Sequence, residues 1–463
     1  MTPSARQASG TPFALMAVEG ALVLGAVAAA VEWQFPGAAI ERVLEPGLAA
    51  RAIGFAIITV GSLYCWDFYD RYLPVSPRKL LLRLVKASAS AAGILAIVSY
   101  LLPPLRIGRG ILFVSIGLIV LIVFARRLAA VAVRSKADLR QRVLILGTGA
   151  VARCVAEEAL ARPQLGFKIH GFLDDDPALQ GVSIVNPRVV GTTADVLRLV
   201  RQEGISRVVV ALSERRGRLP LACLIAVKLA GTTVQDASSF YELLTGKILV
   251  EHLKPSSLIF SDGFRPSRAA RAIKRLVELP VALVALLLTL PILLVLGLLV
   301  RFDSPGPALL RQVRVGERER HFVLYKFRSM RLDAESGSGP VWAAGEDPRV
   351  TRVGRWLRKL RLDELPQLWN VVRGDMSFVG PRPERPHFVD ELRKEIPYYS
   401  ERHAVKPGIT GWAQVRHPYG NTVADALEKL KFDLYYIKNM SLGLDLAVLL
   451  RTVKVVLLGR GAL

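Results

Sequence analysis

The chain is poor in cysteine, and it lacks the motifs of several common enzyme classes. Its 463 residues include only three cysteines, Cys65, Cys154 and Cys223, without paired or metal-type spacing. We therefore expect neither a disulfide framework nor a zinc site. The chain has no His-Glu-x-x-His sequence and no Gly-x-x-x-x-Gly-Lys-Ser/Thr phosphate loop. These absences argue against a zinc metalloprotease and a P-loop nucleotidase.

Acidic residues are also scarce relative to basic ones. The 62 lysines and arginines outnumber the 39 aspartates and glutamates and give a formal net charge of +23. Such a balance suits anionic lipid, phosphorylated substrates or nucleic acid as partners. Hydrophobic residues make up 52% of the chain, which is high for a soluble protein and indicates membrane segments. The length allows two or three domains.

Four long apolar runs occupy the first third of the chain, at about 13–32, 50–68, 84–102 and 110–126. Each run is close to the length needed to cross the hydrocarbon core of a bilayer, about 17–25 residues. Buried helices of a soluble bundle are the alternative, which is weaker because four such runs follow one another closely. We therefore predict a four-helix transmembrane bundle over residues 1–139.

Basic residues in the loops predict the orientation of this bundle. The loop 33–49 carries two glutamates and one arginine, whereas the loop 69–83 carries Arg71, Arg78, Lys79 and Arg83. Because cytoplasmic loops are enriched in lysine and arginine, both ends of the bundle are expected on the cytoplasmic side. Arg106 and Arg109, in the short outer loop, go against the rule.

The pattern changes after residue 140 to short apolar strands separated by helical stretches. A strand at 143–146 is followed by Gly147-Thr148-Gly149, and a second strand ends at Asp174. This G-x-G-x-x-A turn with a later acid predicts a Rossmann-like domain over 140–262. Gly147, Gly149 and Asp174 are its candidate nucleotide-binding residues. A domain that keeps this shape for regulation or assembly is the favoured alternative, because none of the 11 tyrosines begins the Tyr-x-x-x-Lys pattern of short-chain dehydrogenases.

A further apolar run at about 279–300 has Pro291 in its middle and basic residues on both flanks. A proline inside a helix removes a hydrogen bond and kinks the helix. We therefore predict a re-entrant helix that enters the membrane and returns to the same side, within a third domain over 263–463. The alternative is a plain fifth span, which would place everything after it outside the cell.

Two adjacent carboxylates, Asp363 and Glu364, stand just before Pro366. Proline is favoured in the first turn of a helix, so a helix beginning there would hold both acids at its N-terminus. Further on, Pro381 and Pro383 enclose Arg382 in a turn suited to presenting a phosphate ligand. An acid pair near several arginines suits phosphoryl transfer. A capped surface helix with salt bridges is the alternative.

Several motifs after residue 265 point to one family. They are Tyr-Lys-Phe-Arg at 325–328, Asp-Glu-Leu-Pro-Gln at 363–367, Gly-Pro-Arg-Pro at 380–383 and Lys-Pro-Gly-Ile-Thr-Gly-Trp at 406–412. Together they resemble the bacterial sugar transferase family of monotopic phosphoglycosyl transferases, nearly continuously over 265–463. The apolar helices and Rossmann-like domain resemble the large members, and the region 384–420 resembles the exopolysaccharide type. The expected fold is thus a membrane α/β protein with a transmembrane bundle, a Rossmann-like domain and a re-entrant-helix catalytic domain.

The resemblance implies a reaction and the residues that perform it. Family members move a sugar 1-phosphate from a UDP-sugar to undecaprenyl phosphate and release UMP. Asp363 is then the nucleophile that forms an aspartyl phosphosugar, and Glu364 assists as a base for the lipid phosphate. Mg²⁺ is expected at the diphosphate, with both acids as candidate ligands. The implied substrate-binding residues are Lys326, Arg328, Arg358, Pro381, Arg382 and Pro383.

The same resemblance implies partners and a location. The expected partners are a UDP-sugar, undecaprenyl phosphate and membrane lipid, with a homodimer as a further expectation and no nucleic acid. The protein would lie in the bacterial inner membrane with its catalytic domain on the cytoplasmic face, and would serve exopolysaccharide or lipopolysaccharide biosynthesis. Two other functions stay open: a membrane-anchored nucleotide-sugar oxidoreductase or dehydratase, and a non-enzymatic assembly platform.

Overall fold

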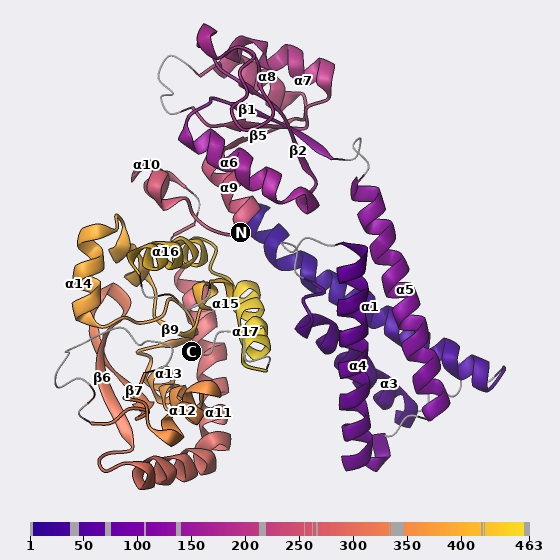
Figure 1. Cartoon of the computed structure of the whole chain (residues 1–463), viewed down its shortest axis with the longest axis vertical. Helices are drawn as coiled ribbons and strands as arrows, with labels where there is room; N and C mark the ends of the chain where they lie inside the picture. Colours follow the sequence, from indigo (N-terminus) through magenta and orange to yellow (C-terminus); the bar gives the residue numbers. More distant parts are fainter. Residues whose placement is uncertain are drawn as a thin grey trace. The chain divides into compact units, whose positions relative to one another are not determined.

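The computed structural model of the chain forms two compact units. One comprises Gly10–Thr245, and the other comprises Gly246–Leu463 together with Met1–Ser9. Figure 1 shows their elements. The structure describes all residues except 1–2, 38–45, 70–75, 106–107, 136–139, 213–218, 254, 262, 265–266, 333, 335–346, 418–419, 421 and 458–463. Arg71 and Arg106, which entered the orientation argument, lie outside the described residues.

Long helices cover all four predicted apolar runs. They are α1 (Pro3–Gln34), α3 (Pro46–Cys65), α4 (Pro77–Leu101) and α5 (Arg109–Ser135). One side chain from each, Val27, Phe55, Leu84 and Val123, is almost fully buried in their shared core. Their outer faces are apolar too, with exposed residues such as Ile57. Each helix is long and apolar enough to cross a bilayer, and the chain is a membrane α/β protein.

A five-stranded parallel sheet forms the rest of this unit. Its order is β3-β2-β1-β4-β5, which matches the first five strands of the 3-2-1-4-5-6 order of a Rossmann fold. Figure 1 shows α7 and α8 on one face of the sheet and α6 and α9 on the other. The strands are β1 (Gln141–Leu146), β2 (Phe167–Leu173), β3 (Val189–Gly191), β4 (Arg207–Val210) and β5 (Thr233–Asp236). The helices are α6 (Ala150–Ala161), α7 (Val196–Glu203), α8 (Leu221–Leu229) and α9 (Ala237–Thr245).

The second unit is built around a large apolar core that includes Val379, Trp412 and Leu434. Ile248 and Val250, which the sequence placed in the middle domain, belong to the same core, and the second unit begins at Gly246. Its strands are β6 (Leu309–Val315) and β7 (His321–Phe327), which pair antiparallel, and β8 (Ser377–Val379) and β9 (Gly408–Thr410), which pair parallel. Its helices are α10 (Pro255–Phe260), α11 (Arg268–Asp303), α12 (Arg352–Lys359), α13 (Gln367–Arg373), α14 (Pro386–Glu395), α15 (Trp412–Arg416), α16 (Val423–Lys438) and α17 (Leu442–Leu457).

Helix α11 is the fifth helix in the described part of the chain that is long and apolar enough to enter a bilayer. It extends beyond the predicted run at both ends and contains Pro280 and Pro291. Most of its apolar side chains are exposed, and Leu287 and Leu288 are about 70% exposed. Its early part packs against α13, whereas Gly297 lies beside Phe327 of β7. Figure 1 shows the helix bending part-way along its length.

Candidate active site

Asp363 and Glu364 lie in a short 3-10 turn, η8 (Leu362–Glu364), and α13 begins at Gln367 with Pro366 as its N-cap. The predicted helix start near Pro366 is therefore confirmed, but the acids occupy a separate turn just before the helix. Arg361 separates this turn from α12 and has a left-handed backbone, with φ of 53°. Such a conformation is uncommon for a residue other than glycine and often occurs at functional sites.

A buried asparagine on α13 holds this region against strand β7. Asn370 is fully buried, and its side-chain Nδ2 donates to the Val323 carbonyl at 2.7 Å. Its Oδ1 accepts a hydrogen bond from the backbone N–H of Tyr325 at 3.1 Å. Both ends of the amide are therefore used, which fixes α13 beside the strand that carries Lys326. No local pattern in the sequence marks Asn370, because its strand partners are 45 or more residues away in the chain.

The two neighbouring carboxylates have opposite electrostatic surroundings. Burial raises the pKa of Asp363 and the charge of Glu364 raises it further, although Lys326 and two arginines oppose this. For Glu364, burial also acts to raise the pKa, but Arg382 and Arg361 outweigh it, so the pKa lies below its usual range. The Arg382 guanidinium donates to Glu364 Oε1 at 2.9 Å. The structure thus brings the acid pair and the Gly-Pro-Arg-Pro motif together.

Residues 380–384, the arginine loop, connect β8 to α14 and are held through their carbonyls. The Pro381 carbonyl accepts from the Gly408 N–H at 2.9 Å. The Arg382 carbonyl accepts from Arg402 and the Pro383 carbonyl from Arg314, both at 3.0 Å. Pro381 and Pro383 are buried and restrict the backbone further. The loop therefore presents the Arg382 side chain from a fixed backbone.

Arg402 is a functional candidate that the sequence analysis missed. It is 5% exposed and also binds Asp433 Oδ2 at 2.9 Å and the Tyr399 hydroxyl at 2.6 Å. Burial and the Arg402 charge act in opposite directions on Asp433, and burial prevails, raising its pKa to about 6. Nothing in the sequence around Arg402 distinguishes it from the many surface arginines, because its role depends on partners distant in the chain.

Two further predicted substrate-binding residues lie near the acids. Lys326 is on β7, and burial, reinforced by the charge of Arg314, lowers its pKa to about 8. Asp363, Arg358 and Arg382 also act on the Lys326 charge, which places the three cations around one carboxylate. Arg358, on α12, is oriented by a 2.9 Å hydrogen bond from its Nε to the Ser329 hydroxyl. The cluster thus brings three positive charges near Asp363, an arrangement suited to an anionic ligand.

Arg328 has different contacts. Its side chain is 3% exposed, and its guanidinium donates to the carbonyls of Ser304 and Pro305 in the turn that follows α11. These contacts stabilise the turn, and they give no support to the predicted substrate-binding role.

The donors present around Asp363 fit a magnesium ion that is bound mainly through substrate. Among the described residues there is no cluster of three or more histidine, cysteine, aspartate or glutamate side chains. Mg²⁺ is usually held by one or two carboxylates together with substrate phosphates, which matches an acid pair. In the same part of the chain, no protein group hydrogen-bonds to the half-buried Asp363 carboxylate. Its oxygens therefore stay available for a metal ion or a substrate.

The glycine turn of the Rossmann-like domain has the predicted shape. Gly147 has φ of +101°, and a Cβ there would lie 3.0 Å from the Ala211 carbonyl oxygen, so only glycine fits without strain. Gly149 is the N-cap of α6. Asp174, at the end of β2, accepts a 2.6 Å hydrogen bond from the Thr148 hydroxyl. The acid is thus bound by the turn itself, and nucleotide binding by these residues stays a prediction.

Comparisons with known proteins identify the family of the chain. The profile of the bacterial sugar transferase family matches residues 269–459, and that of a CoA-binding domain matches residues 65–218. An Escherichia coli K12 UDP-glucose:undecaprenyl-phosphate glucose-1-phosphate transferase is 34% identical over 68% of this chain and 67% of its own length. The chain belongs to the bacterial sugar transferase family.

The names of two other relatives specify different sugars, N-acetylgalactosamine in one and glucose in the other. An Aeromonas hydrophila UDP-N-acetylgalactosamine-undecaprenyl-phosphate N-acetylgalactosaminephosphotransferase is 44% identical over 50% of this chain and 54% of its own length. A Komagataeibacter xylinus undecaprenyl-phosphate glucose phosphotransferase is 33% identical over 70% of this chain and 60% of its own length. The chain thus spans little more than half the length of these two relatives.

Proposed function

We propose that this protein transfers a sugar 1-phosphate from a UDP-sugar to undecaprenyl phosphate, releases UMP, and so initiates exopolysaccharide synthesis. One observation carries the proposal: the half-buried Asp363 carboxylate, without a protein hydrogen bond in the described part of the chain, lies among the charges of Lys326, Arg358 and Arg382. The names of the relatives, all phosphotransferases that act with undecaprenyl phosphate, support the same reaction.

The reaction proceeds in two displacements at the phosphorus atom next to the sugar. A carboxylate oxygen of Asp363 attacks this phosphorus, the bond to the bridging oxygen of UMP breaks, and UMP leaves with the electron pair. The product is an aspartyl phosphosugar. An oxygen of undecaprenyl phosphate then attacks the same phosphorus, and the Asp363 carboxylate leaves. Covalent catalysis replaces one difficult displacement by two easier ones.

The surrounding cations stabilise charge on the transferring phosphoryl group. Lys326, Arg358 and Arg382 are already in place before the substrate binds, so no reorganisation is needed during the reaction. Mg²⁺, held by Asp363 and Glu364 with the diphosphate, would neutralise further negative charge. Burial raises the pKa of Asp363, so its carboxylate is more basic than that of an ordinary aspartate, which favours it as a nucleophile. Glu364 orients Arg382, and its lowered pKa makes it a weaker proton acceptor than an ordinary glutamate.

We expect this chemistry to take place at the surface of the membrane. An undecaprenyl phosphate offers its head group only at the membrane face, and α11 leads directly into the unit that carries Asp363. We expect α11 to be re-entrant, since its exposed apolar side chains lie between basic flanks and Pro291 interrupts its hydrogen bonding. With four spanning helices before it, the catalytic domain then faces the cytoplasm of the inner membrane, where UDP-sugars occur.

The decisive experiment is intact-mass spectrometry of the purified protein with Mg²⁺ and a panel of UDP-sugars, without lipid. We expect an adduct of one sugar phosphate, and its mass limits the identity of the transferred sugar. Asp363→Asn should abolish the adduct because an amide cannot form the acyl phosphate. Asp390→Asn, an exposed position on α14, is the matched control and should keep it. An adduct of equal yield in Asp363→Asn would refute the assignment of the nucleophile.

UMP release gives the second readout. Adding undecaprenyl phosphate to the isolated adduct should discharge the sugar phosphate to the lipid, and continuous turnover should then release UMP. If no UDP-sugar gives an adduct and no UMP appears with lipid, the proposed function is wrong.

A further inference from the structure

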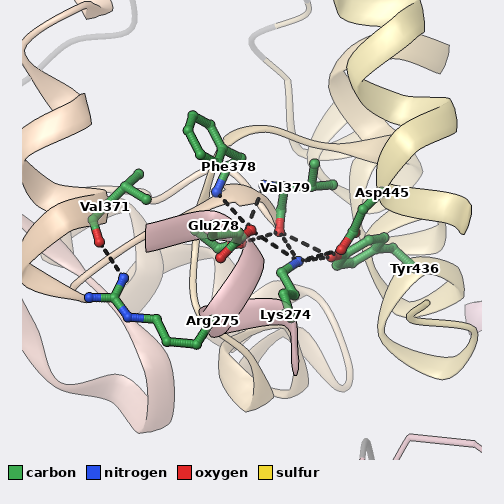
Figure 2. A network of polar contacts seen from close by, with 9 residues as sticks. Lys274, Arg275, Glu278, Val371, Phe378, Val379, Tyr436 and Asp445 are labelled. Carbon is green, nitrogen blue, oxygen red and sulfur yellow. Dashed lines mark hydrogen bonds and ion pairs between the residues drawn. The ribbon is translucent and has the colours of Figure 1, made fainter. Parts of the chain in front are cut away.

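Lys274, in the second turn of α11, is a buried cation outside the cluster around Asp363. It is 9% exposed. Its ammonium group lies 2.9 Å from the Val379 carbonyl oxygen, 2.7 Å from the Tyr436 hydroxyl and 2.9 Å from Asp445 Oδ2 (Figure 2). A lysine has three N–H donors, and these three acceptors use all of them. The position of Lys274 is therefore fully specified by its partners.

The charge of Lys274 is balanced inside the protein. Asp445 is its direct counter-ion, and Glu278, one turn further along α11, lies 3.7 Å away. The Tyr436 hydroxyl lies 2.7 Å from Asp445 Oδ1 and 3.0 Å from the Val379 carbonyl. A buried ion pair is a weak source of net stability compared with apolar packing, so its presence calls for another explanation. Conformational specificity is one such explanation.

The carbonyl that Lys274 binds belongs to Val379, which ends β8 and immediately precedes the arginine loop. Glu278 grips the same strand, accepting hydrogen bonds from the Ser377 hydroxyl at 2.5 Å and the Phe378 N–H at 3.2 Å. Arg275 binds the last turn of α13 by donating to the Val372 carbonyl at 2.7 Å, and Figure 2 shows it beside Val371. The start of α11 thus holds both the helix that follows the acids and the strand that precedes Arg382.

We propose that Lys274 is a positioning residue that sets the arginine loop, and through it Arg382, against Glu364. This inference rests on the proposed function. The carbonyls of residues 381–383 accept hydrogen bonds from Gly408, Arg402 and Arg314. Lys274 donates in the same way to the carbonyl of Val379, directly before the loop. Because Lys274 belongs to α11, the first turns of this helix help to fix the position of the loop that carries Arg382.

The first test is the steady-state kinetics of Lys274→Met and of the double variant Lys274→Met/Asp445→Asn. The double variant removes the direct counter-ion together with the cation, so that Asp445 is not left as an unpaired buried charge. A displaced Arg382 should raise the KM for the UDP-sugar by about tenfold or more, since small misplacements of binding groups are costly. A folding defect alone would lower the amount of active protein and leave KM unchanged.

Lys431→Met is the matched control. Lys431 is also buried and pairs with two carboxylates, Glu428 and Glu251, but it makes no contact with the arginine loop. We expect its KM for the donor to equal that of the unmodified protein. An unchanged KM in both Lys274 variants would overturn the positioning role.

The second test does not depend on activity. Hydrogen exchange of the peptide 377–385 should be faster in Lys274→Met/Asp445→Asn than in the unmodified protein, and unchanged in Lys431→Met. If no UDP-sugar forms an adduct with the unmodified protein, the proposed function fails, and the exchange result still decides whether Lys274 holds the loop. Exchange at the unmodified rate in the double variant would contradict the proposal.

Discussion

Asp363 and Glu364 are adjacent in the chain and chemically alike, yet the fold separates their properties. Glu364 faces Arg382 at 2.9 Å and Arg361 at 4.0 Å, and these charges lower its pKa despite burial. Asp363 has no such hydrogen-bonded partner within the described residues, and burial raises its pKa. Opposite pKa shifts in two neighbouring carboxylates can assign different tasks to similar groups.

These shifts predict a bell-shaped pH dependence of kcat/KM for adduct formation. The rate should rise with pH as Asp363 loses its proton, above the usual value of about 3.9 for an aspartate. It should fall as Lys326 loses its positive charge near pH 8. The kcat/KM profile reports the ionisation of the free enzyme, so it is the quantity to measure across pH.

Lys326→Arg tests the alkaline limb, because an arginine keeps its charge throughout the accessible range. The fall near pH 8 should move to higher pH in this variant. Lys359→Arg, at the exposed end of α12, should leave the profile unchanged. An alkaline limb that stays in place in Lys326→Arg would show that another group controls it.

Site residues that belong to a short sequence motif could be predicted from the sequence. Buried polar residues that hold the site in place through contacts distant in the chain could not. Asp363, Arg358 and Arg382 were found from the sequence and converge in the structure, as does Lys326. Arg328 was predicted in the same motif as Lys326, but it lies just beyond the end of β7, and its guanidinium donates to the turn after α11. Asn370, Lys274 and Arg402 depend on contacts across many residues, which no local pattern reveals.

Among the elements, the apolar ones were predicted best. The run at 143–146 forms the fully buried part of β1. Strands β3 and β5 were not predicted, because they are only three and four residues long and are not uniformly apolar. The predicted re-entrant run omitted the first turns of α11 because these turns are basic, although they carry the contacts of Lys274.

The bend of α11 leads to a prediction about Pro291. Pro291→Ala should restore a helix hydrogen bond and straighten α11, which would carry its end further across the bilayer and impair transfer. Protease-accessibility mapping of inside-out and right-side-out vesicles should then show altered exposure of the chain after residue 303. Pro386→Ala is the control, since a proline at the first position of a helix replaces no hydrogen bond. An unchanged topology and activity in Pro291→Ala would count against the re-entrant helix.

For the whole molecule, the division into two units separates the site from the Rossmann-like domain. The family profile covers 269–459 and lies wholly within the unit that begins at Gly246. The proposed site residues and the Lys274 network also lie in this unit. The sequence placed the boundary near 263 because the basic segment there is conspicuous, whereas the packing of Ile248 and Val250 could not be seen without the fold.

This division predicts that residues 246–463 suffice for the first displacement. The fragment, purified in detergent, should form the same sugar-phosphate adduct as the full chain, and Asp363→Asn should abolish it. Circular dichroism and the retention of a cooperative thermal transition would establish that the fragment is folded. A folded fragment without an adduct would assign an essential role to the first 245 residues.

The exposed apolar surface of α11 has a consequence for how such a transferase meets its acceptor. An enzyme held at a bilayer encounters undecaprenyl phosphate by lateral diffusion in two dimensions. The concentration that governs the second displacement is then the mole fraction of acceptor in the bilayer, not its bulk molarity. The donor still arrives from solution, so added inert lipid would lower the effective concentration of the acceptor and leave that of the donor unchanged. The first displacement would then depend on the concentration of UDP-sugar in solution, and the second on the lipid composition of the bilayer.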